Sequence, residues 1–178
     1  ASGVAPKLVQ LLGNDDVKNK CKVPVVRTLG NFVAGSEDQT QVAIDAGILN
    51  HLARLLGSSS KMIRKEASWL TSKMAAGSRA QISMLMKKTK IISKIIKIAQ
   101  NDLWEVRKEA LWAVAHICTS GSDSHIMSLV DVGGLQPLIS VLRLQNIYSA
   151  LLLVILEALG RILEVGTKFP HQNYVQLI

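Results

Sequence analysis

The segment GILNHLARLL at residues 47–56 occurs in four versions along the chain, and this recurrence decides the fold. The other versions are GVAPKLVQLL at 3–12, KIISKIIKIA at 90–99 and GLQPLISVL at 134–142. Their first residues, 3, 47, 90 and 134, lie 44, 43 and 44 residues apart. A period of this length is typical of repeat proteins built from units of two or three helices, so the sequence predicts an all-α repeat architecture.

The residues between the apolar segments also repeat in a fixed order. In the unit that starts at residue 47, a polar turn over residues 57–60 leads to a longer helix that begins near Ile63 and ends at Gly77. We expect this glycine to supply the left-handed residue that commonly ends a helix. One more short helix, over residues 80–86, comes before the next apolar segment. The same features return in the following unit at Val106, Gly121 and residues 124–130.

Three helices in each unit distinguish armadillo repeats from two-helix repeats. We therefore predict an all-α, right-handed armadillo-repeat superhelix, an α-solenoid of about three full repeats with partial ends. Residues 1–178 form one domain in this interpretation, with units that start near residues 3, 47, 90 and 134. A single unit cannot bury its apolar faces alone, so stacked neighbours form the core and a concave groove. We interpret the chain as part of a longer array, with apolar surface exposed where the stack stops.

Composition and residue spacing disfavour several function classes. The chain lacks an apolar run of about 18 residues, the length that a membrane-spanning helix needs, so we expect no membrane partner. Its four histidines and two cysteines show no metal-ligand spacing. No glycine-rich phosphate loop and no nucleophile with a nearby base are visible, so we predict a protein that is not an enzyme and holds no cofactor or metal.

The net charge of +8 raises the question of nucleic acid, and much of this charge is local. Five lysines crowd one short segment: Lys87, Lys88, Lys90, Lys94 and Lys97. Such a run is usually a solvated helix face, and no aromatic residues alternate with these lysines to stack on bases. The pattern therefore disfavours nucleic acid binding. The alternative, a nucleic acid site at this cluster, predicts DNA retention that depends strongly on salt.

Two long helices carry a tryptophan at the repeat period. The segments KEASWLTSK at 65–73 and KEALWAVAH at 108–116 place Trp69 and Trp112 43 residues apart. Positions i, i+3 and i+7 of a helix share one face. Each tryptophan therefore lies in a stripe with two polar residues, and the two stripes are Glu66–Trp69–Lys73 and Glu109–Trp112–His116.

A separate apolar stripe accounts for the core contacts of the first of these helices. It consists of Ile63, Ala67, Leu70 and Met74. An isolated tryptophan is most often a core residue. Because the aliphatic stripe is already complete and offset by about one residue, we expect both periodic tryptophans to point into the groove instead. Trp104 does not follow the period, and we assign it to structure.

These motifs together resemble the importin-α family. The run RTLGNFVAGSEDQTQ at 27–41, the AIDAG at 43–47 and the two KEAxW helices carry the resemblance. It covers nearly the whole chain and corresponds to about the sixth to the eighth repeat of that family. Importin-α proteins are nuclear import adaptors that shuttle between nucleus and cytoplasm and hold basic nuclear localisation signals extended along the groove. The resemblance implies the minor signal site, and we expect the segment that binds importin-β to be missing from this chain.

In that family, each groove helix has a tryptophan followed four residues later by an asparagine. The resemblance assigns Arg27 and Asn31 to this pair in the first groove helix, with arginine in the place of tryptophan. The other groove residues that it implies are Glu66, Trp69, Lys73, Glu109, Trp112 and His116. Tryptophan faces attract the cationic heads of lysine and arginine by about 0.5–2 kcal/mol each, and an asparagine amide both donates and accepts hydrogen bonds.

The chain departs from the family pattern at two groove positions, because Lys73 and His116 stand where the family has asparagine. Lysine only donates hydrogen bonds and adds positive charge to a site for cations, whereas neutral histidine keeps one donor and one acceptor. We therefore predict weaker or altered binding of basic peptides. Two alternatives stay open: the changes are neutral, or the chain is an armadillo interaction scaffold with a different protein ligand.

Overall fold

The computed structural model describes residues 3–14 and 16–169, and within them the chain forms eleven α-helices and no strand. The helices are α1 (Val4–Gly13), α2 (Asn19–Val33), α3 (Glu37–Asp45), α4 (Leu49–Leu56), α5 (Lys61–Ala75), α6 (Arg79–Met86), α7 (Thr89–Asn101), α8 (Trp104–Ser120), α9 (Asp123–Asp131), α10 (Leu135–Val141) and α11 (Ser149–Lys168). The four apolar segments of the repeat form α1, α4, α7 and α10. The predicted short helices form α6 and α9, with boundaries within one residue of those expected.

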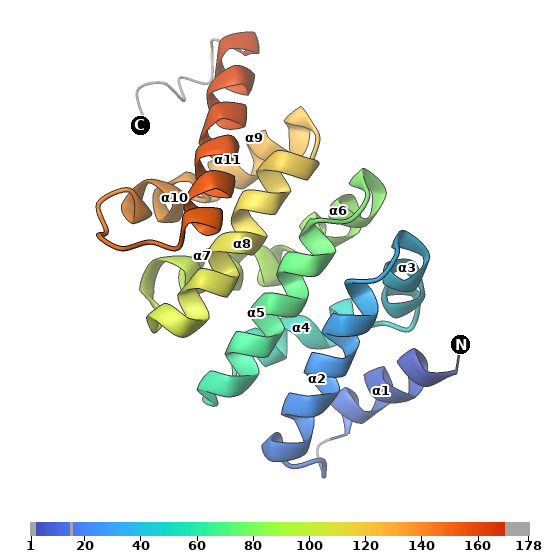
Figure 1. Ribbon diagram of the computed structural model, residues 1–178. Helices are drawn as coiled ribbons and strands as arrows, with labels where there is room; N and C mark the ends of the chain where they lie inside the picture. Colours follow the sequence, from blue (N-terminus) through green and yellow to red (C-terminus); the bar gives the residue numbers. More distant parts are fainter. Residues whose placement is uncertain (1–2, 15, 170–178) are drawn as a thin grey trace.

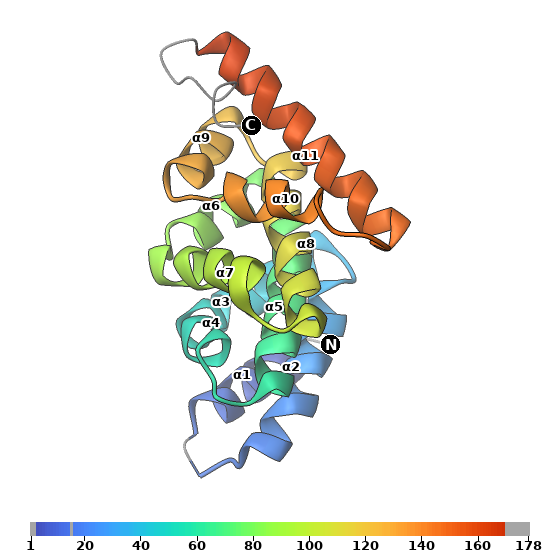
Figure 2. The ribbon, with the colours of Figure 1, turned by 90° about the vertical axis from the view of Figure 1, so that its left-hand side faces the viewer.

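The helices stack in three layers that repeat along the molecule. The long helices α2, α5, α8 and α11 lie side by side and pack on their neighbours along their lengths (Figure 1). The helices α1, α4, α7 and α10 form a second layer behind them (Figure 2), and the short helices α3, α6 and α9 follow one edge, on the right in Figure 1. The predicted α-solenoid of three-helix units is therefore confirmed. We call α2, α5 and α8 the groove helices from here on.

The core follows the apolar stripe that the sequence predicts. Ile63, Ala67, Leu70 and Met74 on α5 are each at most 1% exposed. Buried side chains of α2 and α8 join them in one continuous apolar cluster that runs through the stack. Since a fully buried leucine or isoleucine contributes about 1.5–3 kcal/mol relative to an exposed one, this stripe stabilises the contact between neighbouring units.

The short helices begin with a repeated cap that also links one unit to the next. Ser36, Ser78 and Ser122 precede α3, α6 and α9, and each forms a capping box with the third residue of its helix. In two of the boxes that third residue reaches further. The Gln81 amide donates to the Glu37 carbonyl oxygen at 2.7 Å, and the His125 ring nitrogen Nε2 lies 2.8 Å from the Ser83 hydroxyl.

The glycines at the ends of the long helices do not have the predicted conformation. Gly121 has φ −77°, and the glycines with positive φ are Gly47 and Gly133, both at +89°. These two lie before α4 and α10, where the chain turns from a short helix into an apolar one. Gly121 answers a different need: a Cβ there would lie 2.2 Å from the Ile117 carbonyl oxygen. Close approach to the helix end, and not a left-handed backbone, requires glycine at this position. Gly77 likewise is not among the positive-φ residues.

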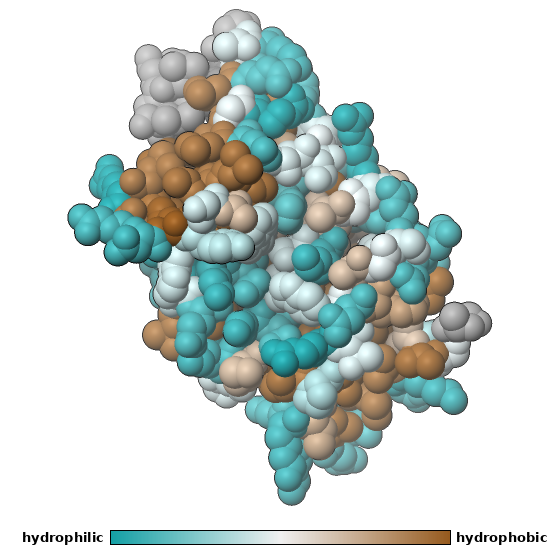
Figure 3. Space-filling view, in the orientation of Figure 1, coloured by the Kyte–Doolittle hydropathy of each residue, from teal (hydrophilic) through white to brown (hydrophobic). Residues whose placement is uncertain are grey.

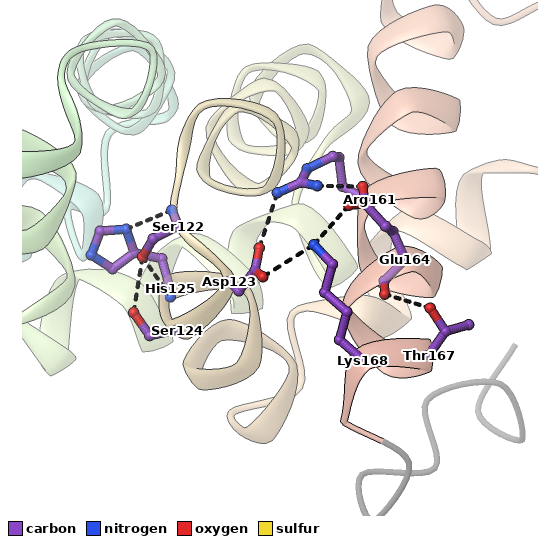
Figure 4. A network of polar contacts seen from close by, with 8 residues as sticks. All are labelled: Ser122, Asp123, Ser124, His125, Arg161, Glu164, Thr167 and Lys168. Atoms are coloured by element: carbon purple, nitrogen blue, oxygen red, sulfur yellow. Dashed lines mark hydrogen bonds and ion pairs between the residues drawn. The ribbon is translucent and has the colours of Figure 1, made fainter.

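Ion pairs join helix α11 to α9, and α11 also carries exposed apolar side chains. Arg161 and Lys168 reach Asp123 at 3.1 and 3.3 Å, and both also pair with Glu164 (Figure 4). Hydrophobic surface covers part of α11 in Figure 3. The exposed leucines of this helix are Leu153, Leu156 and Leu163. The expected apolar surface at the end of the stack is therefore present on α11, while residues 170–178 lie outside the described part of the chain.

No helix in the described ranges has the length and apolarity of a membrane span.

Candidate peptide-binding groove

The groove helices bring most of the predicted site residues into one cleft. A cleft of about 270 Å³ is lined by Arg27, Asn31, Lys65, Glu66, Trp69 and Glu109. Five of these six were predicted, and Lys65 was not. The remaining predicted residues, Lys73, Trp112 and His116, lie further along α5 and α8. The eight predicted side chains thus belong to three adjacent helices of one layer (Figure 1).

Arg27 and Glu66 join α2 to α5 by a two-pronged ion pair. The Arg27 Nε donates to Glu66 Oε2 at 3.1 Å, and the Nη2 of the same guanidinium donates to Oε1. The Glu66 side chain is only 4% exposed, whereas that of Arg27 is 55% exposed. The hydrogen bond and the charge of Glu66 raise the pKa of Arg27. Within the cleft, therefore, the charge of Glu66 is already neutralised by the protein itself.

The indole of Trp69 packs closely against α2 because residue 30 has no side chain. A Cβ at Gly30 would lie 2.2 Å from one indole carbon and 2.6 Å from another. Gly30 is buried in the last turn of α2, and inside a helix glycine costs about 1 kcal/mol of stability relative to alanine. That unfavourable placement was a signal in the sequence that something packs there, and our reading of the sequence missed it.

The two residues that replace the family's asparagines cover the tryptophans of their own helices. The Lys73 ammonium lies 5.8 Å from the centre of the Trp69 ring. The His116 imidazole stacks on Trp112, with ring centres 5.3 Å apart and planes at 27°. Both contacts join residues four positions apart, which share a helix face. Each half-buried tryptophan therefore already has a partner within the chain.

The environment of His116 favours its neutral form. Burial lowers the pKa of the imidazole, and the positive charge of Lys73 lowers it further. A neutral ring offers one hydrogen-bond donor and one acceptor. His116 therefore differs from Lys73 in kind: it fills space and stacks, whereas Lys73 brings a full charge into the groove.

Glu109 is the carboxylate of the cleft that has no ion pair among the described residues. Burial raises its pKa, and the nearby charges of Lys108 and Lys65 oppose that shift. The negative charge of Glu66 raises the pKa of Glu109 as well. A cation that entered this cleft would thus meet Glu109 as its available negative charge, in a cleft that Trp69 also lines.

Trp104 lies outside the cleft, as expected, but on the surface and not in the core. It is the first residue of α8 and 41% exposed. The Arg107 guanidinium lies 5.9 Å from the centre of its ring. This position makes Trp104 a surface tryptophan of the same molecule with which the two groove tryptophans can be compared.

In comparisons with known proteins, this chain is similar to an armadillo repeat family and to importin alpha subunits. The Armadillo/beta-catenin-like repeat family matches residues 36–76. Importin subunit alpha-1b of Oryza sativa subsp. japonica is 36% identical over 166 residues, which cover 93% of this chain and 30% of that protein. Importin subunit alpha-4 of Arabidopsis thaliana is 37% identical over 166 residues, with the same two coverages. The chain thus spans less than a third of the length of these relatives.

The fold also matches solved structures of designed armadillo repeat proteins. One of them, in complex with the peptide (KR)4, superposes with a TM-score of 0.78 at 29% sequence identity, covering 92% of this chain and 71% of that chain. Computationally designed armadillo repeat proteins for modular peptide recognition give a TM-score of 0.78 at 26% identity, covering 91% of this chain and 70% of that chain.

Proposed function

We propose, from the premise that this chain is an armadillo-repeat relative of the importin α subunits, that its groove binds extended basic peptides of the nuclear localisation signal type. The single observation that carries the proposal is the cleft that Trp69 and Glu109 both line, in which Glu109 has no ion pair among the described residues. A lysine or arginine of a peptide can lay its aliphatic stem along the indole and direct its charge to the carboxylate. Attraction of a cation to an aromatic face contributes about 0.5–2 kcal/mol.

The peptide class follows from the chemistry of the cleft and from its structural neighbour. A designed armadillo repeat protein that superposes on 92% of this chain holds the strongly basic peptide (KR)4. Extended peptides present side chains at a period of two residues, and parallel groove helices can form successive pockets for them. In the same proposal, the chain serves as part of an adaptor for transport between cytoplasm and nucleus, and importin-β binds a segment of the adaptor other than this groove.

The affinity of this groove for basic peptides is proposed to be reduced. An incoming cation competes with Lys73 for the face of Trp69 and with Arg27 for Glu66. On α8, His116 covers Trp112 in the same manner. The ligand must therefore displace internal partners, and the two cations that it meets repel it.

The three tryptophans provide the experiment. We expect fluorescence anisotropy with labelled (KR)4 to give weaker binding for Trp69→Ala and Trp112→Ala than for the wild type, because each loses an aromatic wall. Trp104→Ala is the matched control, since it removes the same side chain from a surface position outside the cleft, and its affinity should not change. Equal losses in all three variants, or equal affinities in all four proteins, would overturn the proposal.

The second candidate is an interaction scaffold with another protein ligand. The positions of Lys73 and His116 favour it, because each of them already contacts the ring of a groove tryptophan. In the same assay, a neutral or acidic peptide that binds through Trp69 and Trp112 while (KR)4 does not would select this candidate over the first.

A further inference from the structure

A second charged surface lies away from the groove, on α7. Lys90, Lys94 and Lys97 occupy positions i, i+4 and i+7 of this helix and so share one face. Lys87 and Lys88 precede its first turn. We call these five residues the α7 lysine surface. Helix α7 belongs to the second layer, between α4 and α10 and behind the groove helices (Figure 2).

Among the described residues, the lysines of this surface form no ion pair, although Asp45 borders a neighbouring cleft together with Lys87 and Lys88. Residues 67–101 contain no aspartate and no glutamate. Within the described ranges, the polar contact made by the five ammonium groups is that of Lys88 with the Asn50 side-chain oxygen at 3.1 Å. Two lysines elsewhere do have carboxylate partners, since Lys61 pairs with Glu105, and Lys168 with Asp123 and Glu164. The charge on α7 is therefore available to a partner.

The start of α7 adds to the positive potential. No side chain caps this helix, whereas serine side chains cap α3 and α9. The first amide groups of a helix carry the positive end of its dipole, so an uncapped start beside Lys88 and Lys90 favours a negatively charged ligand.

The lysines line clefts between α4 and α7 instead of standing on a smooth ridge. One cleft, of about 320 Å³, is bordered by Lys87, Lys88 and Lys90 together with Asn50 and residues of α4. A second cleft, of about 530 Å³, is bordered by Lys94 and Lys97. The one carboxylate in the second cleft, Asp102, is paired with Arg64 at 2.7 Å. The lysines of the two clefts extend from residue 87 to residue 97, which corresponds to about 15 Å along the axis of a helix.

The same clefts contain apolar surface. Leu56, Ile98 and Leu103 line the second cleft, and Leu103 is 58% exposed. A ligand that carried only charge would leave this leucine uncovered. A peptide with acidic residues and an occasional leucine would satisfy both features.

We propose that the α7 lysine surface binds an acidic segment of a protein partner. The charged strip is one helix wide, because α10 has no charged residue and α4 has one, Arg54. A nucleic acid ligand needs either stacking side chains or a wide set of phosphate contacts. No aromatic side chain lines either cleft. A short acidic peptide fits a strip of these dimensions, and the surface leaves the groove free for a second ligand at the same time.

The test compares two charge-reversal variants of equal net charge. The first combines Lys90→Glu, Lys94→Glu and Lys97→Glu, and the control combines Lys7→Glu, Lys18→Glu and Lys20→Glu, all at exposed positions near the N-terminus. The probe is a fluorescent peptide EELEELEE, with QQLQQLQQ as the uncharged reference. We expect the first variant to lose at least about tenfold in affinity for EELEELEE, and the control variant to lose much less. Thermal melts establish that both variants are folded.

Other results would reject the proposed acidic-peptide site. Equal losses in the two variants would show that net charge alone holds the peptide, and no binding of EELEELEE by the folded wild type would likewise reject the site. Tighter binding of a single-stranded DNA with the same number of charges would assign the surface to nucleic acid. Binding of (KR)4 should be unaffected by the α7 variant, so this proposal and the groove proposal can fail separately.

Discussion

The groove and the α7 lysine surface are both rich in cations, but the protein uses these cations in opposite ways. In the groove, Arg27 is paired with Glu66 and Lys73 lies over Trp69. On α7, five lysines have no carboxylate partner among the described residues. A net charge of +8 does not distinguish these cases. What separates them is whether a carboxylate or an aromatic face of the same chain lies within reach of the cation, as Glu66 does for Arg27 and Trp69 for Lys73. A cation with such a partner is already occupied, whereas a cation without one can bind a ligand.

The largest expected effect comes from the packing beneath the groove. Gly30→Val should destabilise the protein by about 1–3 kcal/mol, because the new side chain overlaps the Trp69 ring and overpacking costs that much. Urea unfolding followed by tryptophan fluorescence measures the change. The variant should also bind (KR)4 more weakly, since Trp69 is pushed from its place in the cleft.

A second glycine gives the control for that variant. Gly160 lies within α11, and a Cβ there meets no atom within 4 Å. Gly160→Ala should therefore raise stability by about 0.5–1 kcal/mol through helix propensity alone. If Gly30→Val were as stable as the wild type, the close packing of Trp69 on α2 would be wrong.

Removal of the ion pair between Arg27 and Glu66 should leave a charged side chain in the groove without an internal partner, as on the α7 lysine surface. Arg27→Ala frees the Glu66 carboxylate, so we expect stability to fall and binding of (KR)4 to strengthen, with a peptide cation in the place of the guanidinium. Titration calorimetry measures the binding. Arg64→Ala serves as the control, since it breaks the comparable pair with Asp102 outside the groove and should lower stability without strengthening (KR)4 binding. Weaker binding by Arg27→Ala than by the wild type would count against the competition that we describe.

The smallest expected effect is the dependence of stability on pH through His116. Burial and Lys73 lower the pKa of His116 in the folded protein, so the unfolded chain takes up its proton first as the pH falls. The contribution of His116 to stability is complete above its ordinary pKa near 6.5 and is lost as the pH falls through the lower folded value. An NMR titration should find the pKa of His116 below 6.5 in the wild type and closer to it in Lys73→Asn. An unchanged value in the variant would show that Lys73 does not act on this ring.

The sequence predicted the architecture because the repeat period and the apolar stripe are local patterns. Four apolar segments at a constant spacing specify stacked helices, and Ile63, Ala67, Leu70 and Met74 follow the helical period on one face, where the structure buries them. The residues of the cleft were placed largely by the same period. Residues that are one repeat period apart in the sequence occupy equivalent positions in the structure, since each unit packs on its neighbour in the same way.

The ion pair between Arg27 and Glu66 and the packing of Trp69 on Gly30 were harder to predict, because they cross from one repeat to the next. Arg27 and Glu66 are 39 residues apart, and nothing in either segment alone pairs them. The sequence shows Gly30 as one residue of the RTLGNF motif, and it does not show that the Trp69 ring of the next repeat packs on this glycine. The predicted left-handed conformation of the glycines at the ends of the long helices was wrong for a related reason. Gly121 is required because a Cβ there would overlap the Ile117 carbonyl oxygen, and this contact is not visible in the sequence.

The central claim is that Lys73 and His116 hold the groove tryptophans in contacts within the chain and thereby weaken basic-peptide binding. Titration calorimetry of (KR)4 with the wild type and with Lys73→Asn/His116→Asn tests it most directly. The account predicts at least about tenfold tighter binding by the double variant, which corresponds to about 1.4 kcal/mol. Equal or weaker binding by a folded double variant would contradict it.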